Sequence, residues 1–114
     1  MEKRYPRMAL GAALLPWHED FTLDELLFRK GIKTLVTNGL KYIYTFGTAG
    51  EGYGIDEKIF TKVTAAFADE LKGTDVVPIT GVISLSMSEM IHRLEIAYNL
   101  GIRDFQISFP SWGP

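Results

Sequence analysis

The feature that most constrains this chain is a regular alternation between short apolar segments and longer amphipathic ones. The apolar or β-branched segments predict strands at residues 8–15, 42–46, 76–80 and 104–108. Between them, apolar side chains recur at helical spacing and predict three helices. The strands begin about 30 residues apart, which is typical of repeated βα units that join parallel strands through right-handed crossovers. The pattern therefore predicts an α/β protein with the order βαβαβαβ.

Capping residues and glycines mark the ends of the predicted helices. Thr22, followed by Glu25 three residues later, is typical of a capping box at the first helix. The other signals are the caps Asp56 and Ser86 or Ser88, and the stops Gly39, Gly73 and Gly101. The apolar stripes predicted for the first and third helices contain Leu23, Leu26, Leu27, Ile32, Leu35 and Val36, and Met90, Ile91, Leu94, Ala97 and Tyr98. No linker interrupts this series, so we expect no domain boundary within residues 1–114.

Composition and charge exclude several classes of protein. Twelve Lys and Arg against 14 Asp and Glu leave a net charge of −2, so a basic surface for nucleic acid is not expected. The absence of cysteine excludes disulfides and thiolate metal sites, and two distant histidines predict no metal centre. No apolar run reaches the roughly 20 residues that span a bilayer. The first 20 residues lack a small-residue cleavage site, so we expect a cytoplasmic protein with no membrane partner.

Four parallel strands with three helices leave two sheet edges unpaired. An open doubly wound sheet normally adds a fifth strand and a closing helix, whereas a (β/α)8 barrel has roughly 250 residues. The pattern in these 114 residues therefore ends midway through either fold.

The most informative connection is the glycine-rich segment 47–54 (GTAGEGYG), which follows the second predicted strand. In parallel α/β folds, functional loops lie at the carboxyl ends of the strands. Glycines allow backbone N–H groups to turn inward, the next helix N-terminus adds positive potential, and Thr48 adds a hydroxyl. The segment lacks the Gly-Lys-Ser/Thr of a P-loop and the glycine spacing of a dinucleotide-binding turn. It predicts either a carboxylate or phosphate cradle or a tight turn without a ligand.

The neighbouring motifs make the prediction more specific. Leu15-Pro16 ends the first strand, Gly47-Thr48-Ala49-Gly50-Glu51 ends the second, Pro78-Ile79-Thr80-Gly81-Val82 lies at the third, and Ala97-x-x-x-Gly101 precedes the fourth. This order resembles the dihydrodipicolinate synthase/N-acetylneuraminate lyase family of class I aldolases, over about residues 8 to 114. The resemblance implies a (β/α)8 TIM barrel, of which this chain supplies the first half, βαβαβαβ, as the N-terminal half of a single domain.

The resemblance also implies a reaction and a site. Members of this family form a Schiff base between a lysine and pyruvate or another 2-oxo acid, and then make or break a carbon–carbon bond or dehydrate a sugar acid. Thr48 matches the hydroxyl of a proton relay, and Ala49 and Gly50 match the loop that holds the substrate carboxylate. No metal or organic cofactor is implied, the partner is a small 2-oxo acid, and a homo-oligomer is expected.

Three departures from the family pattern are visible. Ala49 stands where many relatives carry a second hydroxyl. Trp112 lies nearest to the position of a tyrosine that reaches into a neighbouring subunit, and an indole cannot relay a hydroxyl proton. The Schiff-base lysine and the relay tyrosine belong to later strands, beyond Pro114. None of the seven lysines is predicted at the carboxyl end of a strand, so the 114 residues alone are expected to be inactive.

Two other functions remain open on the sequence alone. The first is a non-catalytic half-barrel that assembles through its open sheet edges. The second is a flavodoxin-like phosphate binder, which would need a fifth strand. Among the other polar residues, we expect Glu51 to accept backbone N–H bonds at the start of the second helix, and His18 and His92 to be exposed.

Overall fold

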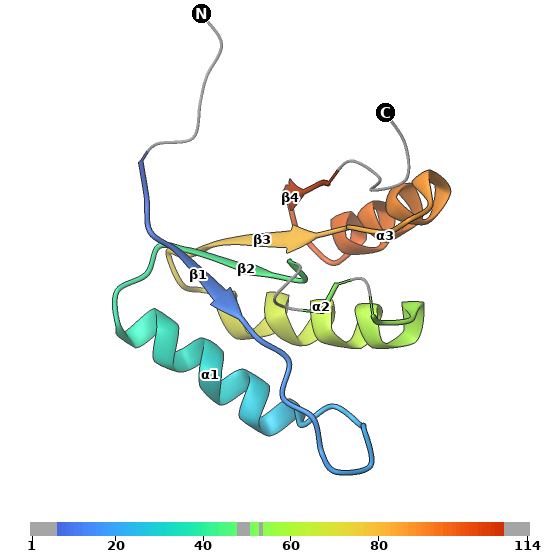
Figure 1. Cartoon of the computed structure of the whole chain (residues 1–114). Coiled ribbons are helices and arrows are strands. Elements are labelled where there is room, and N and C mark those ends of the chain that lie inside the picture. The colour runs from blue at the N-terminus through green and yellow to red at the C-terminus, as the bar shows by residue number, and fades with distance from the viewer. Residues whose placement is uncertain (1–6, 48–50, 53, 109–114) are drawn as a thin grey trace, which may run out of the picture.

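The computed structural model describes residues 7–47, 51–52 and 54–108 of the chain. Its elements are β1 (Leu10–Ala13), α1 (Glu25–Thr37), β2 (Tyr42–Thr45), α2 (Glu57–Leu71), β3 (Val77–Gly81), α3 (Met87–Asn99) and β4 (Asp104–Gln106). The order is the predicted βαβαβαβ, and the first and last strands are shorter than expected. α1 and α2 lie together beneath the strands in Figure 1.

The four strands form one parallel sheet in the order β1-β2-β3-β4. Ala13 pairs with Thr45 and Thr45 pairs with Thr80, so residues at these positions share one face of the sheet. Pro78 lies within β3 and pairs with Ile43, although β3 has a strand on both sides. Sequential parallel strands with helices on one side are the arrangement of half a (β/α)8 barrel. The chain is therefore an α/β half-barrel.

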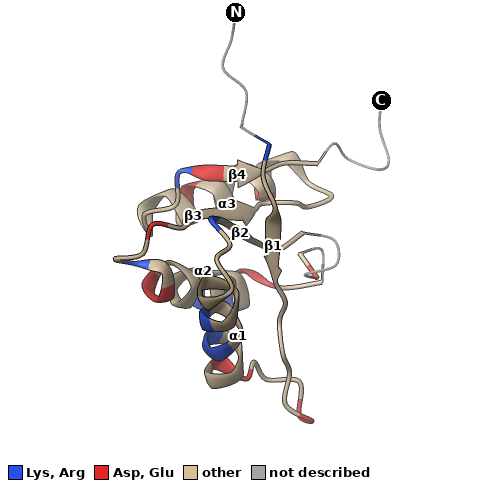
Figure 2. Cartoon of the chain, turned by 90° about the vertical axis from the view of Figure 1, so that its left-hand side faces the viewer, with Lys and Arg blue, Asp and Glu red and all other residues tan. Residues whose placement is uncertain are grey.

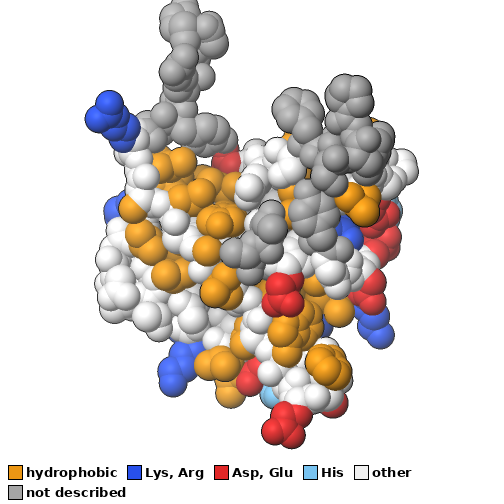
Figure 3. Space-filling model, viewed as in Figure 1, with side chains coloured by type: hydrophobic (Ala, Val, Ile, Leu, Met, Phe, Trp, Pro, Cys, Tyr) orange, Lys and Arg blue, Asp and Glu red, His pale blue; other side chains and the backbone are white. Residues whose placement is uncertain are grey.

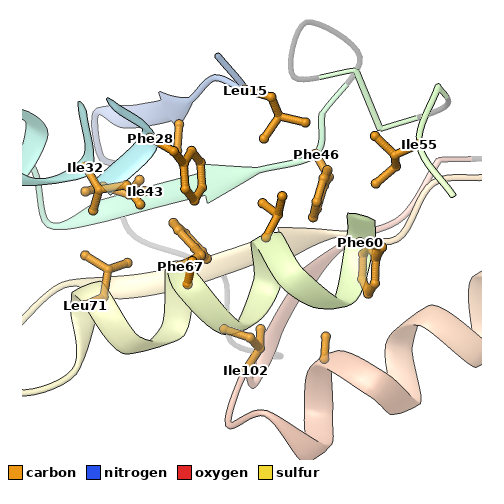
Figure 4. Close-up of a cluster of buried hydrophobic side chains, with 14 of the residues drawn as sticks. Leu15, Phe28, Ile32, Ile43, Phe46, Ile55, Phe60, Phe67, Leu71 and Ile102 are labelled. Atoms are coloured by element: carbon orange, nitrogen blue, oxygen red, sulfur yellow. The ribbon is translucent and has the colours of Figure 1, made fainter. Parts of the chain in front are cut away.

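The core lies between the sheet and its helices. Phe28 of α1, Ile43 of β2 and Phe67 of α2 are almost completely buried in this layer. Figure 4 shows side chains from these elements converging there. Toward the carboxyl end of β2, the rings of Phe46 and Phe60 stack with centroids 5.0 Å apart. This stack joins the end of β2 to the first turn of α2.

The first helix begins at a different residue from the one predicted. Asp24 is the cap of α1, and its carboxylate accepts a hydrogen bond from the Leu27 N–H at 3.0 Å. Thr22 instead donates its hydroxyl to Asp20 at 2.6 Å, within the turn before the helix. The capping-box prediction at Thr22 was therefore wrong by two residues. Asp56 and Ser86 cap α2 and α3 as predicted.

Two of the predicted apolar stripes are partly wrong. Leu26 and Leu27 of α1 and Ile91 and Tyr98 of α3 are exposed. Ile32, Met90 and Ala97 are buried, as expected. The buried set on α3 instead includes Arg93, which lies between Met90 and Ala97 at helical spacing. The stripes predicted from helical spacing are thus only partly covered in the residues that the structure describes.

The unpaired edge at β1 is apolar. Leu10 and Leu14 are exposed there, and Figure 3 shows hydrophobic side chains gathered over this part of the molecule. Figure 2 shows that charged residues lie on the helices, on the connecting loops and at the start of β4, with none on β1. Within the described ranges, no helix is both long and apolar enough to cross a bilayer.

Candidate active site

The candidate site lies where the chain leaves the carboxyl ends of the parallel strands. The segments concerned are 14–20 after β1, 46–55 after β2, 82–85 after β3 and 107–108 after β4. The four residues predicted to act on or bind substrate, Thr48, Ala49, Gly50 and Trp112, lie outside the described residues. The structure does describe residues 46–47 and 51–52 on either side of this segment, and their contacts define the two ends of the loop.

The loop after β2 is closed on itself by a backbone hydrogen bond. The Gly52 N–H donates to the Gly47 carbonyl at 3.1 Å, which brings the two ends of segment 47–52 together. Phe46 and Glu51 have φ values of 64° and 63°, in the left-handed region that non-glycine residues seldom adopt. Such backbone persists only where the surroundings hold it, and it is concentrated at functional sites.

Two glycines make room for the backbone at the end of β2. A Cβ atom on Gly81 would lie 2.3 Å from the carbonyl oxygen of Phe46, and a Cβ on Gly52 would lie at the same distance from that oxygen. The Phe46 carbonyl therefore fits between the loop after β2 and the end of β3 only because both positions lack a side chain. Inward-facing N–H groups were predicted for the glycines of segment 47–54, whereas the structure shows close backbone approach at Gly52 and likewise at Gly81.

Glu51 connects two neighbouring loops. Its Oε2 accepts a hydrogen bond from the Trp17 indole N–H at 2.9 Å, so the loop after β1 is tied to the loop after β2. The prediction that Glu51 accepts backbone N–H bonds at the start of α2 was wrong, because Asp56 takes that role by accepting from the Ile59 N–H. A capping aspartate leaves the glutamate side chain available for the indole.

Arg93 is a buried charged residue beside the candidate site that sequence reasoning missed. It is 5% exposed, and its guanidinium donates to the carbonyls of Gly52, Ile83 and Ile55 at 3.0, 3.2 and 2.8 Å. A signal was present in the sequence, because Arg93 stands three residues after Met90 and four before Ala97, on the stripe that faces the core. The charged residues Glu89 and Glu95 nearby are typical of a solvent-exposed stretch, so Arg93 was not singled out from the sequence.

The histidines lie on the surface, as predicted. His18 is exposed, with Nδ1 3.8 Å from an Asp24 carboxylate oxygen. His92 is also exposed, and its Nε2 lies 2.6 Å from Oε1 of Glu57 at the start of α2. Across the described ranges, no group of three His, Cys, Asp or Glu residues is placed to hold a metal ion.

The described lysines do not approach the candidate site from a strand end. Lys30 and Lys33 are exposed on α1, Lys58 and Lys62 are exposed on α2, and Lys72 is exposed at the end of α2. Lys41 precedes β2 at the opposite end of the sheet and pairs with Asp75. This placement agrees with the prediction, and no lysine from the described part of the chain follows the carboxyl end of a strand.

Comparison with known proteins decides the family. The model of the dihydrodipicolinate synthetase family matches residues 6–110. The chain belongs to this family. It is 23% identical over 107 residues to a probable 5-dehydro-4-deoxyglucarate dehydratase of Oceanobacillus iheyensis, covering 94% of this chain and 34% of the relative. The chain thus spans about a third of the length of that relative.

Solved structures of the dihydrodipicolinate synthetase family have the same fold. A putative dihydrodipicolinate synthetase from Pseudomonas aeruginosa superposes with a TM-score of 0.85 at 22% identity, over 92% of this chain and 36% of its own. YagE, a prophage protein of the dihydrodipicolinic acid synthase family from E. coli K12 in complex with pyruvate, gives a TM-score of 0.86 at 16% identity, over 91% and 35%. At these identities the likeness establishes the half-barrel fold.

Proposed function

We propose that this chain is the N-terminal half of a single (β/α)8-barrel lyase that acts on pyruvate or a related 2-oxo acid through a Schiff base. In this proposal the chain holds the substrate carboxylate, and a lysine on a later strand supplies the amine. Ala49 and Gly50 would contact the carboxylate, Trp112 would border the substrate, and the Thr48 hydroxyl would relay a proton. No metal or organic cofactor is needed, since the lysine itself is the electron sink once it has formed the iminium.

The observation that carries the proposal is the loop between Gly47 and Gly52, in a chain of this family. It is closed by its own hydrogen bond, it lies at the carboxyl end of β2, and α2 begins shortly after it at a residue capped by Asp56. A helix N-terminus next to such a loop favours an anion, because its free N–H groups and dipole carry positive potential. A carboxylate is the anionic group of every 2-oxo acid.

The proposed roles of this chain and of the later strands follow from where the lysines lie. A Schiff base forms when a neutral amine attacks the ketone carbon and the carbonyl oxygen leaves as water, which needs an amine beside the substrate. The described lysines lie on helices or at the other end of the sheet, so this half contributes binding and proton transfer. A cytoplasmic location and a homo-oligomeric state remain predictions.

The test is the intact mass of the protein isolated from its own cells, after incubation with pyruvate and borohydride. We expect a species much heavier than the 114-residue chain that gains the mass of one reduced pyruvate adduct. Borohydride without pyruvate is the control. A species of 12.8 kDa with no adduct would refute catalysis by this polypeptide.

The exposed apolar edge favours a second candidate function, a non-catalytic half-barrel. Leu10 and Leu14 are exposed on the β1 side, and Ile107 is exposed just after β4. Two copies related by a two-fold axis could pair β4 of each with β1 of the other and close eight parallel strands. Light scattering on the purified chain tests this: a dimer that Leu14→Glu converts to monomer supports it, and a stable wild-type monomer overturns it.

A further inference from the structure

Arg93 holds together two loops that leave the sheet at the same end. Its Nη1 donates to the Gly52 carbonyl in the loop after β2 and to the Ile83 carbonyl after β3. Its Nη2 donates to the carbonyl of Ile55, just before α2. One side chain on α3 thus bridges backbone groups more than 25 residues apart in sequence, in the connections after β2 and β3.

Burial of a guanidinium at this position costs free energy unless its N–H groups find hydrogen-bond acceptors. Arg93 is 5% exposed, and its Nε is 3.3 Å from a carboxylate oxygen of Glu89. Its Cζ also lies 5.4 Å from the ring centroid of Phe60, which stacks on Phe46 at the end of β2. An apolar residue would fit the Met90–Ala97 stripe with no desolvation penalty, and replacing buried ionic groups by apolar ones is often neutral or stabilising. The arginine therefore has a local task that packing alone does not require.

We propose that Arg93 is a positioning residue that sets the shape of the loop after β2 and, through it, the affinity of that loop for a substrate carboxylate. The affinity part rests on the proposed function. The guanidinium acts on the substrate through the backbone of Gly52 and Ile55, without touching it. Three carbonyls on one planar fork fix direction as well as distance, which a lysine ammonium on a flexible stem does not.

The experiment compares Arg93→Lys with Arg103→Lys in the 114-residue chain by NMR. Arg103 is the matched control, because it also donates to two backbone carbonyls, those of Tyr98 and Ile102, and lies over an aromatic ring, but at the opposite end of the sheet. The readouts are hydrogen exchange of the Gly52 amide, which closes the loop, and the dissociation constant for pyruvate from amide shifts. The Lys41 and Asp75 amides report on the far end.

We expect Arg93→Lys to speed exchange at Gly52 and to weaken pyruvate binding, each by about tenfold, the size expected for losing one hydrogen bond to a charged group. Arg103→Lys should leave both unchanged. Uniformly faster exchange along the chain, with pyruvate affinity unchanged, would overturn the proposal, because it would mean a purely structural role. Equal effects of the two variants at Gly52 would overturn it as well.

Glu89→Gln gives a milder second variant in case Arg93→Lys does not fold. It keeps the guanidinium and removes only the carboxylate charge at Nε, so we expect smaller changes of the same sign at Gly52. An exchange rate at Gly52 equal to that of the wild type would contradict the proposal. A wild-type chain that shows no pyruvate shift at all would count against the proposed function and against the affinity part. Exchange at Gly52 would still decide separately whether Arg93 positions the loop.

Discussion

Replacing Gly81 with alanine tests whether close backbone contact shapes the end of β2. The new Cβ would lie 2.3 Å from the Phe46 carbonyl oxygen, 2.8 Å from its carbonyl carbon and 3.2 Å from the Thr45 oxygen. All three are backbone atoms of a buried segment, so none can rotate away as a side-chain tip would. Overpacking of this kind costs about 1–3 kcal/mol, and contact with backbone atoms alone places Gly81→Ala toward the upper end.

Replacing Gly31 with alanine should instead raise the free energy of unfolding. Gly31 lies inside α1, and a Cβ there would meet no atom within 4 Å. Alanine in a helix interior is favoured over glycine by about 0.5–1 kcal/mol. Urea denaturation followed by circular dichroism measures both free energies of unfolding, and thermal melts should show Gly81→Ala lowering Tm by about 4–8 °C per kcal/mol.

A Gly81→Ala variant as stable as wild type would refute this reasoning. It would mean that β2 and β3 separate at little cost, and that the Phe46 carbonyl is not confined between Gly81 and Gly52. Stabilisation by both alanines would mean that reduced freedom of the unfolded chain outweighs the contacts at either position.

Two further predictions follow from the caps and the ion pairs. Asp24→Ala should lower the free energy of unfolding by about 1 kcal/mol, because the cap of α1 is lost, and Thr22→Val should cost less; urea denaturation compares them. The ammonium of Lys41 lowers the pKa of Asp75, so Lys41→Met should raise that pKa toward its ordinary value in a carboxyl NMR titration. A lowered folded-state pKa means that this small surface contribution is present at neutral pH and is lost as pH falls through that pKa.

The order of elements was predictable because each carries its own local signal. The βαβαβαβ series, the caps Asp56 and Ser86, and the helix stop at Gly101, whose φ is 103°, all depend on residues a few positions apart. The start of α1 was misplaced because two acceptors compete nearby. Thr22 fits a capping box by sequence, but its hydroxyl is taken by Asp20, and Asp24 is left to cap the helix.

The contacts within the site were less predictable, because they join residues far apart in sequence. No local sequence signal indicates that Glu51 accepts a hydrogen bond from the Trp17 indole 34 residues away. Nor does one indicate that Gly52 and Gly81 both lie against the Phe46 carbonyl. The charge of Arg93 is typical of a solvent-exposed residue, while its spacing from Met90 and Ala97 indicates the core. Spacing determined the outcome, because three backbone carbonyls satisfy the guanidinium.

The loop after β2 is held from three directions by this chain alone: by Gly81 of β3, by Arg93 of α3, and by Trp17 from the β1 side. The hydrogen bond from Trp17 to Glu51 is the weakest of these contacts, because the carboxylate that accepts it is exposed. Such a bond contributes about 0.5–1.5 kcal/mol to stability at most. Trp17→Phe keeps the aromatic ring and removes only the donor. We therefore expect a small loss of stability and faster amide exchange at Gly52 and Gly54, by a smaller factor than for Arg93→Lys. Exchange changes confined to residues 18–24 would show that the tie orders the loop after β1 instead.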